Sequence, residues 1–249
     1  MPHIPKTVLI TGATGDFGIA FAKKFAAAGS NLILHGRNQE KLDLLKESFP
    51  DAKTLCFDIG DHNAITDALK NIDAPDLLIN NAGGAIGQEP AYDAKLEDWL
   101  NMVNINVTGL ITTTNMILPK MVARQSGHII NIGSVAGNYA YAGGHVYNGC
   151  KAFVRFFSGA LRSDLIDKNI RITNIEPGMV ETQFSLVRFK GDKDKADAVY
   201  AGADALQADD IAESVFWVAS QPPHVNISRL EVMSTTQATG SLAVHRKTA

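Results

Sequence analysis

The chain has 249 residues, of which 45% are hydrophobic and 20% are charged, and its formal net charge is −3. This composition is ordinary for a soluble globular protein, and the absence of a basic stripe argues against a nucleic-acid partner. No apolar run approaches the roughly 18 residues of a membrane-spanning helix, and the first strand-like run begins without a signal peptide. Two cysteines, Cys56 and Cys150, do not make a disulfide framework. We therefore expect a cytoplasmic protein with no membrane partner.

Short apolar runs alternate with segments of helical spacing along the chain, and no Pro-, Ser- or Gly-rich linker interrupts them. The predicted strands are residues 6–11, 31–35, 53–57, 76–79, 128–133, 171–175 and 229–233. The predicted helices are residues 19–28, 39–48, 62–70, 96–121, 147–167 and 209–219. This alternation predicts one α/β domain over residues 1–249, a Rossmann-type doubly wound parallel sheet of about seven strands with helices on both faces.

The first predicted strand leads into a glycine-rich turn, GATGDFG, which begins at Gly12 and is followed by a helix. A strand, a glycine turn and a helix open a dinucleotide-binding unit, in which backbone N–H groups at the helix N-terminus bind a pyrophosphate. A glycine-rich turn without this context is usually only a turn. We expect cofactor contacts at Gly12, Thr14, Asp16, Phe17 and Gly18.

The second predicted strand ends in Gly36-Arg37-Asn38, without an acidic residue. In NAD-binding proteins an acid at this point bonds the ribose 2′-hydroxyl, whereas an Arg accommodates a 2′-phosphate. Arg37 and Asn38 therefore favour NADP(H) as the cofactor. The alternative is that Arg37 is a surface residue near the start of the next helix.

Ser134 follows the fifth predicted strand, and Tyr147 and Lys151 lie four residues apart on the next helix, hence on one face. A free phenol has a pKa of about 10, so a Tyr that exchanges protons near neutral pH must be perturbed. A cation roughly 4 Å away can supply about three pKa units at an effective dielectric of about 20. If strand and helix are neighbours, a carbonyl oxygen can accept hydrogen bonds from both hydroxyls. The pattern suits reversible proton transfer to a carbonyl while hydride arrives from elsewhere.

These motifs, with Asn80-Asn81-Ala82-Gly83, resemble those of the short-chain dehydrogenases/reductases from about residue 6 to about residue 245. Within that family the chain looks most like the NADP-dependent 3-hydroxy acid dehydrogenases, also described as serine or allo-threonine dehydrogenases and malonic semialdehyde reductases. The narrower match is carried by residues 127–137, 141–147, 151–158, 185–192 and 224–233. The resemblance implies a catalytic set of Asn106, Ser134, Tyr147 and Lys151.

The resemblance also implies a role for each member of this set. Tyr147 exchanges the proton, and Lys151 lowers its pKa and holds the nicotinamide ribose. Ser134 orients the substrate oxygen, and Asn106 holds a water that connects the lysine to solvent, often at a kink in its helix. Cofactor contacts are implied at Asp58, Ile59, Asn81, Ala82, Gly83, Tyr147, Lys151, Pro177, Gly178, Val180 and Thr182. Taken alone, Asp58 could equally cap the next helix, and Pro177-Gly178 could be a plain turn.

One position departs from the family pattern TGxxxGxG, which places a glycine where this chain has Asp16. Asp tolerates unusual backbone angles and can cap a helix start. It also places a carboxylate near the cofactor phosphates. Weakened cofactor affinity or a slightly re-aimed turn is therefore expected.

Residues 184–206 are polar and charged, which fits a mobile lid over the active site. Within this segment Arg188 lies between two apolar residues that could turn inward, so it is our candidate partner for a substrate carboxylate, beside Ser134 and Tyr147. A surface salt bridge is the alternative. We expect interconversion of a small 3-hydroxy acid and its 3-oxo acid or semialdehyde. Alternatives are reduction of another anionic aldehyde such as sulfoacetaldehyde, broad carbonyl reduction and, more remotely, non-catalytic NADPH binding.

The remaining histidines lack metal-ligand spacing, so no metal is expected. The resemblance implies a homo-oligomer, with a tetramer favoured over a dimer, built through the long helices. The tail, residues 234–249, is polar except for Leu242 and Val244. It could pack on a neighbouring subunit through His245 or Arg246, or it could be disordered.

Overall fold

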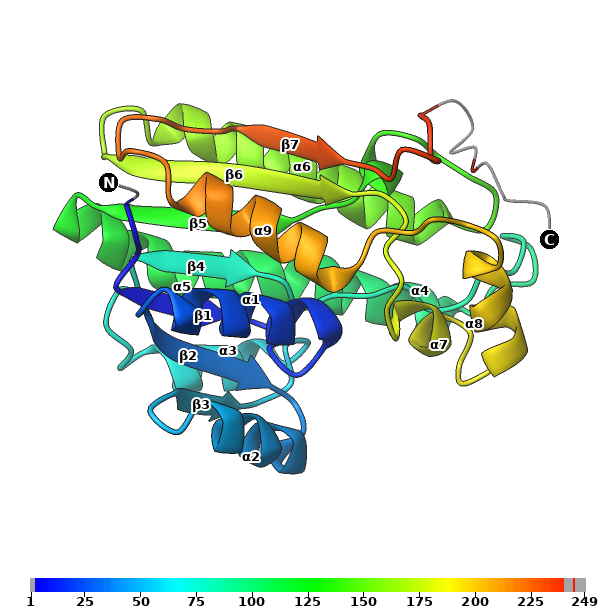
Figure 1. Cartoon of the computed structure of the whole chain (residues 1–249), viewed down its shortest axis with the longest axis horizontal. Helices are drawn as coiled ribbons and strands as arrows, with labels where there is room; N and C mark the ends of the chain where they lie inside the picture. The colour runs from blue at the N-terminus through cyan, green and yellow to red at the C-terminus, as the bar shows by residue number, and fades with distance from the viewer. Residues whose placement is uncertain (1–2, 240–243, 245–249) are drawn as a thin grey trace.

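A parallel β-sheet organises the computed structural model, which describes residues 3–239 and residue 244 (Figure 1). His245 and Arg246 lie outside the described residues. The strands are β1 (Thr7–Ile10), β2 (Asn31–Gly36), β3 (Lys53–Cys56), β4 (Leu77–Asn80), β5 (Gly127–Ile132), β6 (Ile170–Pro177) and β7 (Arg229–Val232). They form one seven-stranded sheet in the order β3-β2-β1-β4-β5-β6-β7, with every pairing parallel. The strand order reverses between β1 and β4, where a doubly wound sheet opens a crevice at its carboxyl ends.

Helices cover both faces of this sheet, as the alternating pattern predicted. They are α1 (Asp16–Ala27), α2 (Gln39–Ser48), α3 (His62–Leu69), α4 (Leu96–Val103), α5 (Gly109–Arg124), α6 (His145–Asp164), α7 (Phe184–Arg188), α8 (Lys193–Tyr200) and α9 (Ala208–Ala219). In Figure 1, α1 and α9 lie in front of the sheet, and α3, α5 and α6 lie behind it. No helix in the described part of the chain is both long and apolar enough to cross a membrane.

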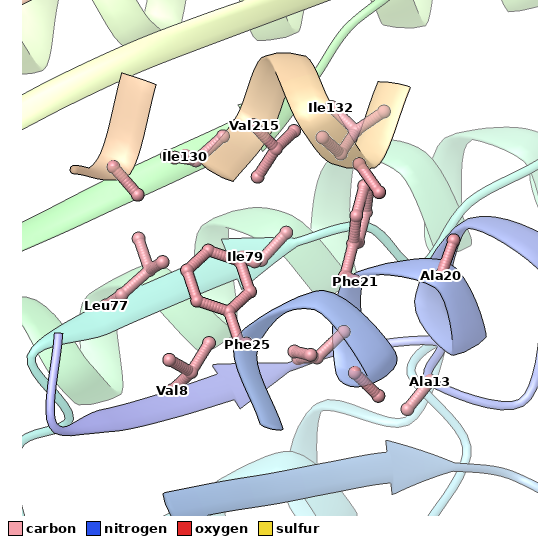
Figure 2. Close-up of a cluster of buried hydrophobic side chains, with 14 of the residues drawn as sticks. Val8, Ala13, Ala20, Phe21, Phe25, Leu77, Ile79, Ile130, Ile132 and Val215 are labelled. Atoms are coloured by element: carbon pink, nitrogen blue, oxygen red, sulfur yellow. The ribbon is translucent and has the colours of Figure 1, made fainter. Parts of the chain in front are cut away.

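The central strands are apolar on both faces because each face packs against helices. In β1, Val8 and Ile10 contribute to the cluster under α1 and α9, whereas Leu9 belongs to the cluster on the opposite face. Phe21 and Phe25 of α1 fill the first cluster, and both are fully buried (Figure 2). These two cores fix the carboxyl ends of the strands, where the motif residues lie.

The helix predicted for residues 96–121 is interrupted. α4 is followed by a π-helical turn (Asn104–Thr108), and α5 then continues to Arg124. Inside the turn, Asn106 Nδ2 donates to the carbonyl oxygen of Met102 at 2.8 Å. This is the carbonyl that the Asn106 backbone would use in a regular α-helix, so the side chain competes with the ladder and widens the turn.

The segment expected as a lid, residues 184–206, contains α7 and α8, which the sequence analysis did not predict. Both helices lie beyond the carboxyl ends of the central strands (Figure 1). Just before the segment, Val180 pairs in parallel with Leu206. The backbone N–H of Glu181 donates to Leu206 O at 2.8 Å, so both ends of the segment are held together at its base.

Candidate active site

The glycine-rich turn is held against the end of β4. Gly12 has a φ of +66°, and a Cβ there would lie 3.0 Å from the Cα of Ala82. A Cβ on Gly18 would collide with the carbonyl oxygen of Gly12. Both positions therefore require glycine, one for its left-handed backbone and the other for the close approach of α1 to the turn.

Thr11 and Asn81 tie the same two segments together. Thr11 Oγ1 accepts from the backbone N–H groups of Asn81 at 2.9 Å and Ala82 at 3.0 Å. In return, Asn81 Nδ2 donates to the carbonyl oxygens of Thr11 at 2.9 Å and Gly12 at 3.1 Å. Both N–H groups of the Asn81 side-chain amide are thereby engaged, whereas its Oδ1 has no hydrogen bond among those described for the chain.

His35, which the sequence analysis did not single out, supports the turn from β2. Its Nδ1 accepts from the Gly12 N–H at 3.2 Å, and its Nε2 lies 3.1 Å from the carbonyl oxygen of Phe57. Because a carbonyl can only accept, Nε2 carries the proton and the ring is neutral. Burial lowers the pKa of His35 from 6.5 to about 4. A histidine within an apolar run gave no signal of this role, since its partners are distant in sequence.

Asp16 is the first residue of α1, and the N-cap is Gly15, which has no side chain to cap with. Asp16 is not among the residues with positive φ, so the unusual backbone considered from the sequence is absent there. Its Oδ2 instead accepts from the backbone N–H of Gln183 at 2.6 Å. Phe17 packs on the core beside Phe21, with ring centroids 6.0 Å apart, so only its backbone is left for a cofactor contact.

Arg37 and Asn38 follow β2 directly, and both are exposed. Asn38 Oδ1 accepts from the Lys41 N–H at 2.9 Å and caps α2. The Arg37 guanidinium is thus the cation at the carboxyl end of β2, with no acid in the preceding strand. This is the arrangement that accommodates a 2′-phosphate.

Asp58 and Ile59 follow β3. Asp58 Oδ1 accepts from the Gly60 N–H at 2.8 Å, and the residue that caps α3 is Asp61. Capping is therefore not the role of Asp58. Ile59 is buried in the core on the α3 side of the sheet.

Three side chains with acid–base chemistry meet at the carboxyl end of β5. Ser134 precedes a 3-10 turn (Val135–Gly137), and its hydroxyl is close enough to Tyr147 of α6 to lower the pKa of that phenol. Lys151, one turn further along α6, donates through Nζ to the Ile132 carbonyl oxygen at 2.9 Å. Its Nζ lies 5.7 Å from the centroid of the Tyr147 ring.

Burial dominates the electrostatics of this group. It raises the pKa of Tyr147 above its ordinary value, and Tyr141 adds to the effect, while the Ser134 hydrogen bond and the Arg188 charge oppose it. Burial also lowers the pKa of Lys151 from 10.5 to about 8. Lys151 is not among the groups that shift the pKa of Tyr147 here, so its expected lowering of that pKa stays a prediction.

Asn106 is buried beside this group and holds the chain after β4. Its Oδ1 accepts from the Gly84 N–H at 3.1 Å, and its Nδ2 donates to the Gly84 carbonyl at 2.8 Å. A Cβ on Gly83 would lie 2.6 Å from Asn106 Oδ1 and 3.7 Å from Lys151 Nζ. The π-helical turn therefore brings Asn106 into the same site as Lys151.

The segment after β6 is held by the C-terminal part of the chain. The Gly178 N–H donates to the Val232 carbonyl at 2.8 Å, and the Met179 N–H donates to Gln237 Oε1 at 2.8 Å. Pro177 immediately precedes them, and its carbonyl oxygen lies 3.5 Å from Ser134 Oγ. This segment is therefore more than a plain Pro-Gly turn, and Gln237 is a supporting residue that the sequence did not suggest.

Val180 and Thr182 complete the motif after β6. Val180 is buried at the base of the segment over residues 184–206. Thr182 Oγ1 accepts from the Phe184 N–H at 3.3 Å and so begins the turn into α7.

Arg188 approaches the group around Tyr147 from α7. Its Nε donates to the Gly87 carbonyl at 3.2 Å, and its guanidinium carbon lies 5.3 Å from the centroid of the Tyr141 ring. Its Nη2 is buried and has no hydrogen-bond partner among the described residues. Phe184, on the same helix, lies 5.7 Å from Tyr147 between ring centroids. The guanidinium thus turns inward with one donor group unused.

A buried carboxylate, which the sequence analysis also missed, braces the loop that carries Ser134. Glu176 is fully buried, and burial raises its pKa. It accepts from Asn138 Nδ2 at 2.7 Å and pairs with Arg229 Nε at 2.7 Å. The 3-10 turn is in this way fixed to β6 and β7.

Comparisons with known proteins identify the family of the chain. Residues 6–192 match the family model described as short chain dehydrogenase. The chain is 48% identical over 245 residues to the NADP-dependent 3-hydroxy acid dehydrogenase YdfG of Salmonella typhi, covering 96% of this chain and 99% of that protein. It is 45% identical over 246 residues to serine 3-dehydrogenase of Agrobacterium fabrum, covering 97% and 98%. The solved structure described as the closed form of serine dehydrogenase complexed with NADP+ superposes with a TM-score of 0.92 at 46% identity, covering 97% of this chain and all of that one.

Proposed function

Because the chain belongs to the short-chain dehydrogenase family, we propose that it is an NADP(H)-dependent oxidoreductase that interconverts a small 3-hydroxy acid and its 3-oxo acid or semialdehyde. The substrates are of the 3-hydroxypropionate, serine or allo-threonine type. The observation that carries the proposal is the unused, buried Nη2 of Arg188, on a guanidinium close enough to lower the pKa of Tyr147. A buried donor without a partner costs free energy, and a substrate carboxylate would satisfy it. The names of the relatives support the same substrate class.

The residues present fit NADP(H). Gly12 and Gly18 let the turn pack closely on Ala82 and on α1, so that backbone N–H groups at the N-terminus of α1 could bind a pyrophosphate. Arg37 would hold the 2′-phosphate, and Lys151 would hold the nicotinamide ribose. Asp58, Ile59, Asn81, Ala82 and Gly83, with Pro177, Gly178, Val180 and Thr182, would line the rest of the cofactor site. When bound, NADP(H) supplies the hydride chemistry.

In reduction, the Tyr147 hydroxyl donates its proton to the carbonyl oxygen. Its raised pKa keeps the phenol protonated at neutral pH, which is the state that this step requires. In oxidation, Tyr147 must instead accept the proton, and the positive charge of Arg188 favours the phenolate in that state. Ser134 orients the reacting oxygen by a second hydrogen bond.

Arg188 and the Ser134–Tyr147 pair would hold the two ends of the substrate. The carboxylate would face the guanidinium, and the 3-oxygen would face the two hydroxyls. Residues 184–206 would act as a lid, because α7 carries Phe184 against Tyr147 and Arg188 against Tyr141. Asn106 would keep its place through Gly84 and so maintain the wall next to Lys151 and the proton path to solvent.

A substrate panel tests the proposal. Oxidation of NADPH would be followed with malonic semialdehyde, sulfoacetaldehyde and a neutral aldehyde of similar length, and each reaction would be repeated with NADH. We expect the highest kcat/KM with malonic semialdehyde and NADPH. A higher kcat/KM with sulfoacetaldehyde would assign the substrate as a sulfonate aldehyde instead of a carboxylate. Equal rates with malonic semialdehyde and the neutral aldehyde would indicate a broad carbonyl reductase.

The assembly is proposed to be a homotetramer. Large exposed apolar side chains gather on α4, α5 and α6, namely Leu96, Leu100, Val103, Ile111, Phe153 and Phe156. Burial of this face between subunits would remove it from water. Light scattering should give the mass of a tetramer, and Phe156→Glu, at a side chain 72% exposed in the single chain, should lower the mass.

A cytoplasmic location is also part of the proposal. The two cysteines are free, with Cys56 exposed and Cys150 buried, which fits a reducing compartment. Cell fractionation with detection of the protein tests it.

A further inference from the structure

Asp16 joins the glycine-rich turn to the start of α7 across 167 positions of sequence, through its 2.6 Å bond from the Gln183 N–H. Gln183 is the residue immediately before α7. The Asp16 carboxylate therefore holds Gln183 in place. At Gln183 the chain leaves the cofactor side of the site and begins to cover Tyr147.

The far end of α7 is held separately. The Gly87 N–H donates to the Arg188 carbonyl at 2.8 Å, and Lys190 forms an ion pair with Asp98 of α4 at 2.6 Å. α7 is thus held at Gln183 and around Arg188, and between these points Ser185 Oγ hydrogen-bonds to the hydroxyl of Tyr200 in α8 at 2.7 Å. With only five residues, this helix is too short to stabilise itself, so its anchors determine where Arg188 lies.

The carboxylate at position 16 has an electrostatic consequence as well. It lies in the first turn of α1, whose N-terminus attracts negative charge. No cation forms an ion pair with Asp16 within residues 3–239, and the phosphates of a dinucleotide would approach the same helix end. The carboxylate and the phosphates would therefore repel each other.

We propose that Asp16 is a positioning residue that fixes α7, and through it Arg188, for substrate binding at the expense of cofactor affinity. With Asp16 in place of the family glycine, NADP(H) would bind less tightly, and the lid over the substrate would be better ordered. This inference rests on the proposed function, because it assumes that Arg188 faces the substrate.

Two variants separate the two effects. Asp16→Ala removes both the acceptor and the charge, and its φ is compatible with alanine. Asp16→Asn removes the charge but keeps an oxygen that can accept from Gln183. Asp209→Asn is the control, since Asp209 is an exposed acid in the first turn of α9 and its replacement changes the net charge equally.

Three measurements are needed: amide hydrogen exchange at Gln183, the Kd of NADPH by fluorescence titration, and the KM of the preferred carbonyl substrate. In Asp16→Ala we expect faster Gln183 exchange, with KM raised about fivefold by the loss of one hydrogen bond. In both Asp16 variants the Kd of NADPH should fall at least about twofold at low salt. The difference in Kd from the parent should become smaller as salt is added. Asp16→Asn should keep KM close to the parent value, and Asp209→Asn should match the parent throughout.

Opposite changes in Kd and KM are the signature of the proposal, because a merely structural defect would weaken both. Unchanged Gln183 exchange and KM in Asp16→Ala would overturn it, and so would a Kd that rises together with KM. If no carbonyl substrate is turned over, the proposed function fails on its own. The exchange rate and the NADPH Kd would still decide whether Asp16 anchors α7 and opposes the cofactor.

Discussion

Replacing Arg188 by alanine removes a guanidinium that contacts Gly87 and Tyr141. In the parent chain the Nη2 of this guanidinium is buried and has no hydrogen-bond partner among the described residues. A charge-assisted hydrogen bond is worth about 1.5–3 kcal/mol, so kcat/KM for a carboxylate substrate should fall roughly 10- to 100-fold. Because Arg188 lowers the pKa of Tyr147, the variant should also need higher pH for oxidation. Both effects follow from one positive charge near the Tyr147 phenol.

The assay compares malonic semialdehyde with a neutral aldehyde of similar length in the parent and in Arg188→Ala. Only the carboxylate substrate should lose most of its kcat/KM, since the neutral aldehyde has nothing to pair with the guanidinium. Lys195→Ala is the control for charge in the same segment, because Lys195 is an exposed cation paired with Asp192. Equal losses for both aldehydes in Arg188→Ala would refute the reasoning and leave Arg188 as a structural residue of α7.

Three further outcomes follow from the site and its supports. Tyr147→Phe removes the proton donor, so turnover should fall about 10²- to 10⁴-fold while the NADPH Kd stays the same; near-parental rates would contradict its role. As pH falls from 6.5 towards about 4, the free energy of unfolding should drop by up to about 3 kcal/mol, because the unfolded chain takes up the proton that buried His35 refuses. Urea unfolding across this range checks it, and a flat profile would rule it out. Glu176→Gln breaks the ion pair with Arg229, whose side chain is partly solvated. The unfolding free energy from urea titrations should fall by about 1–3 kcal/mol. An unchanged urea midpoint would show that the ion pair contributes nothing to stability.

The sheet was predictable from the sequence because its strands are buried on both faces. Val8, Leu9 and Ile10 read as one apolar run, although they serve two different cores. The family resemblance then assigned the motif residues to the carboxyl ends of these strands, and the comparisons confirmed the family and the fold.

What the sequence did not reveal depends on contacts between distant segments. The apolar spacing over residues 96–121 continues through the π-helical turn, so only the family resemblance pointed to a kink at Asn106; the side-chain bond that accompanies it is visible only in the structure. α7 is short and derives its stability from Gln183, Gly87 and Asp98 rather than from its own composition. His35 and Glu176 lie in strands, and their hydrogen-bond partners come from segments that are distant in sequence.

The anchoring of the site by β7 and Gln237 has a consequence for how the protein is made. A nascent chain that has passed Lys151 and Arg188 already carries every side chain proposed to act in catalysis. It still lacks the partners of Gly178, Met179 and Glu176, which come from residues 229–237. Because domains fold as units during synthesis, the reaction centre is completed only when this last stretch leaves the ribosome. Incomplete chains therefore hold the chemical groups but not the geometry, so they should bring no unregulated oxidoreductase activity into the cell.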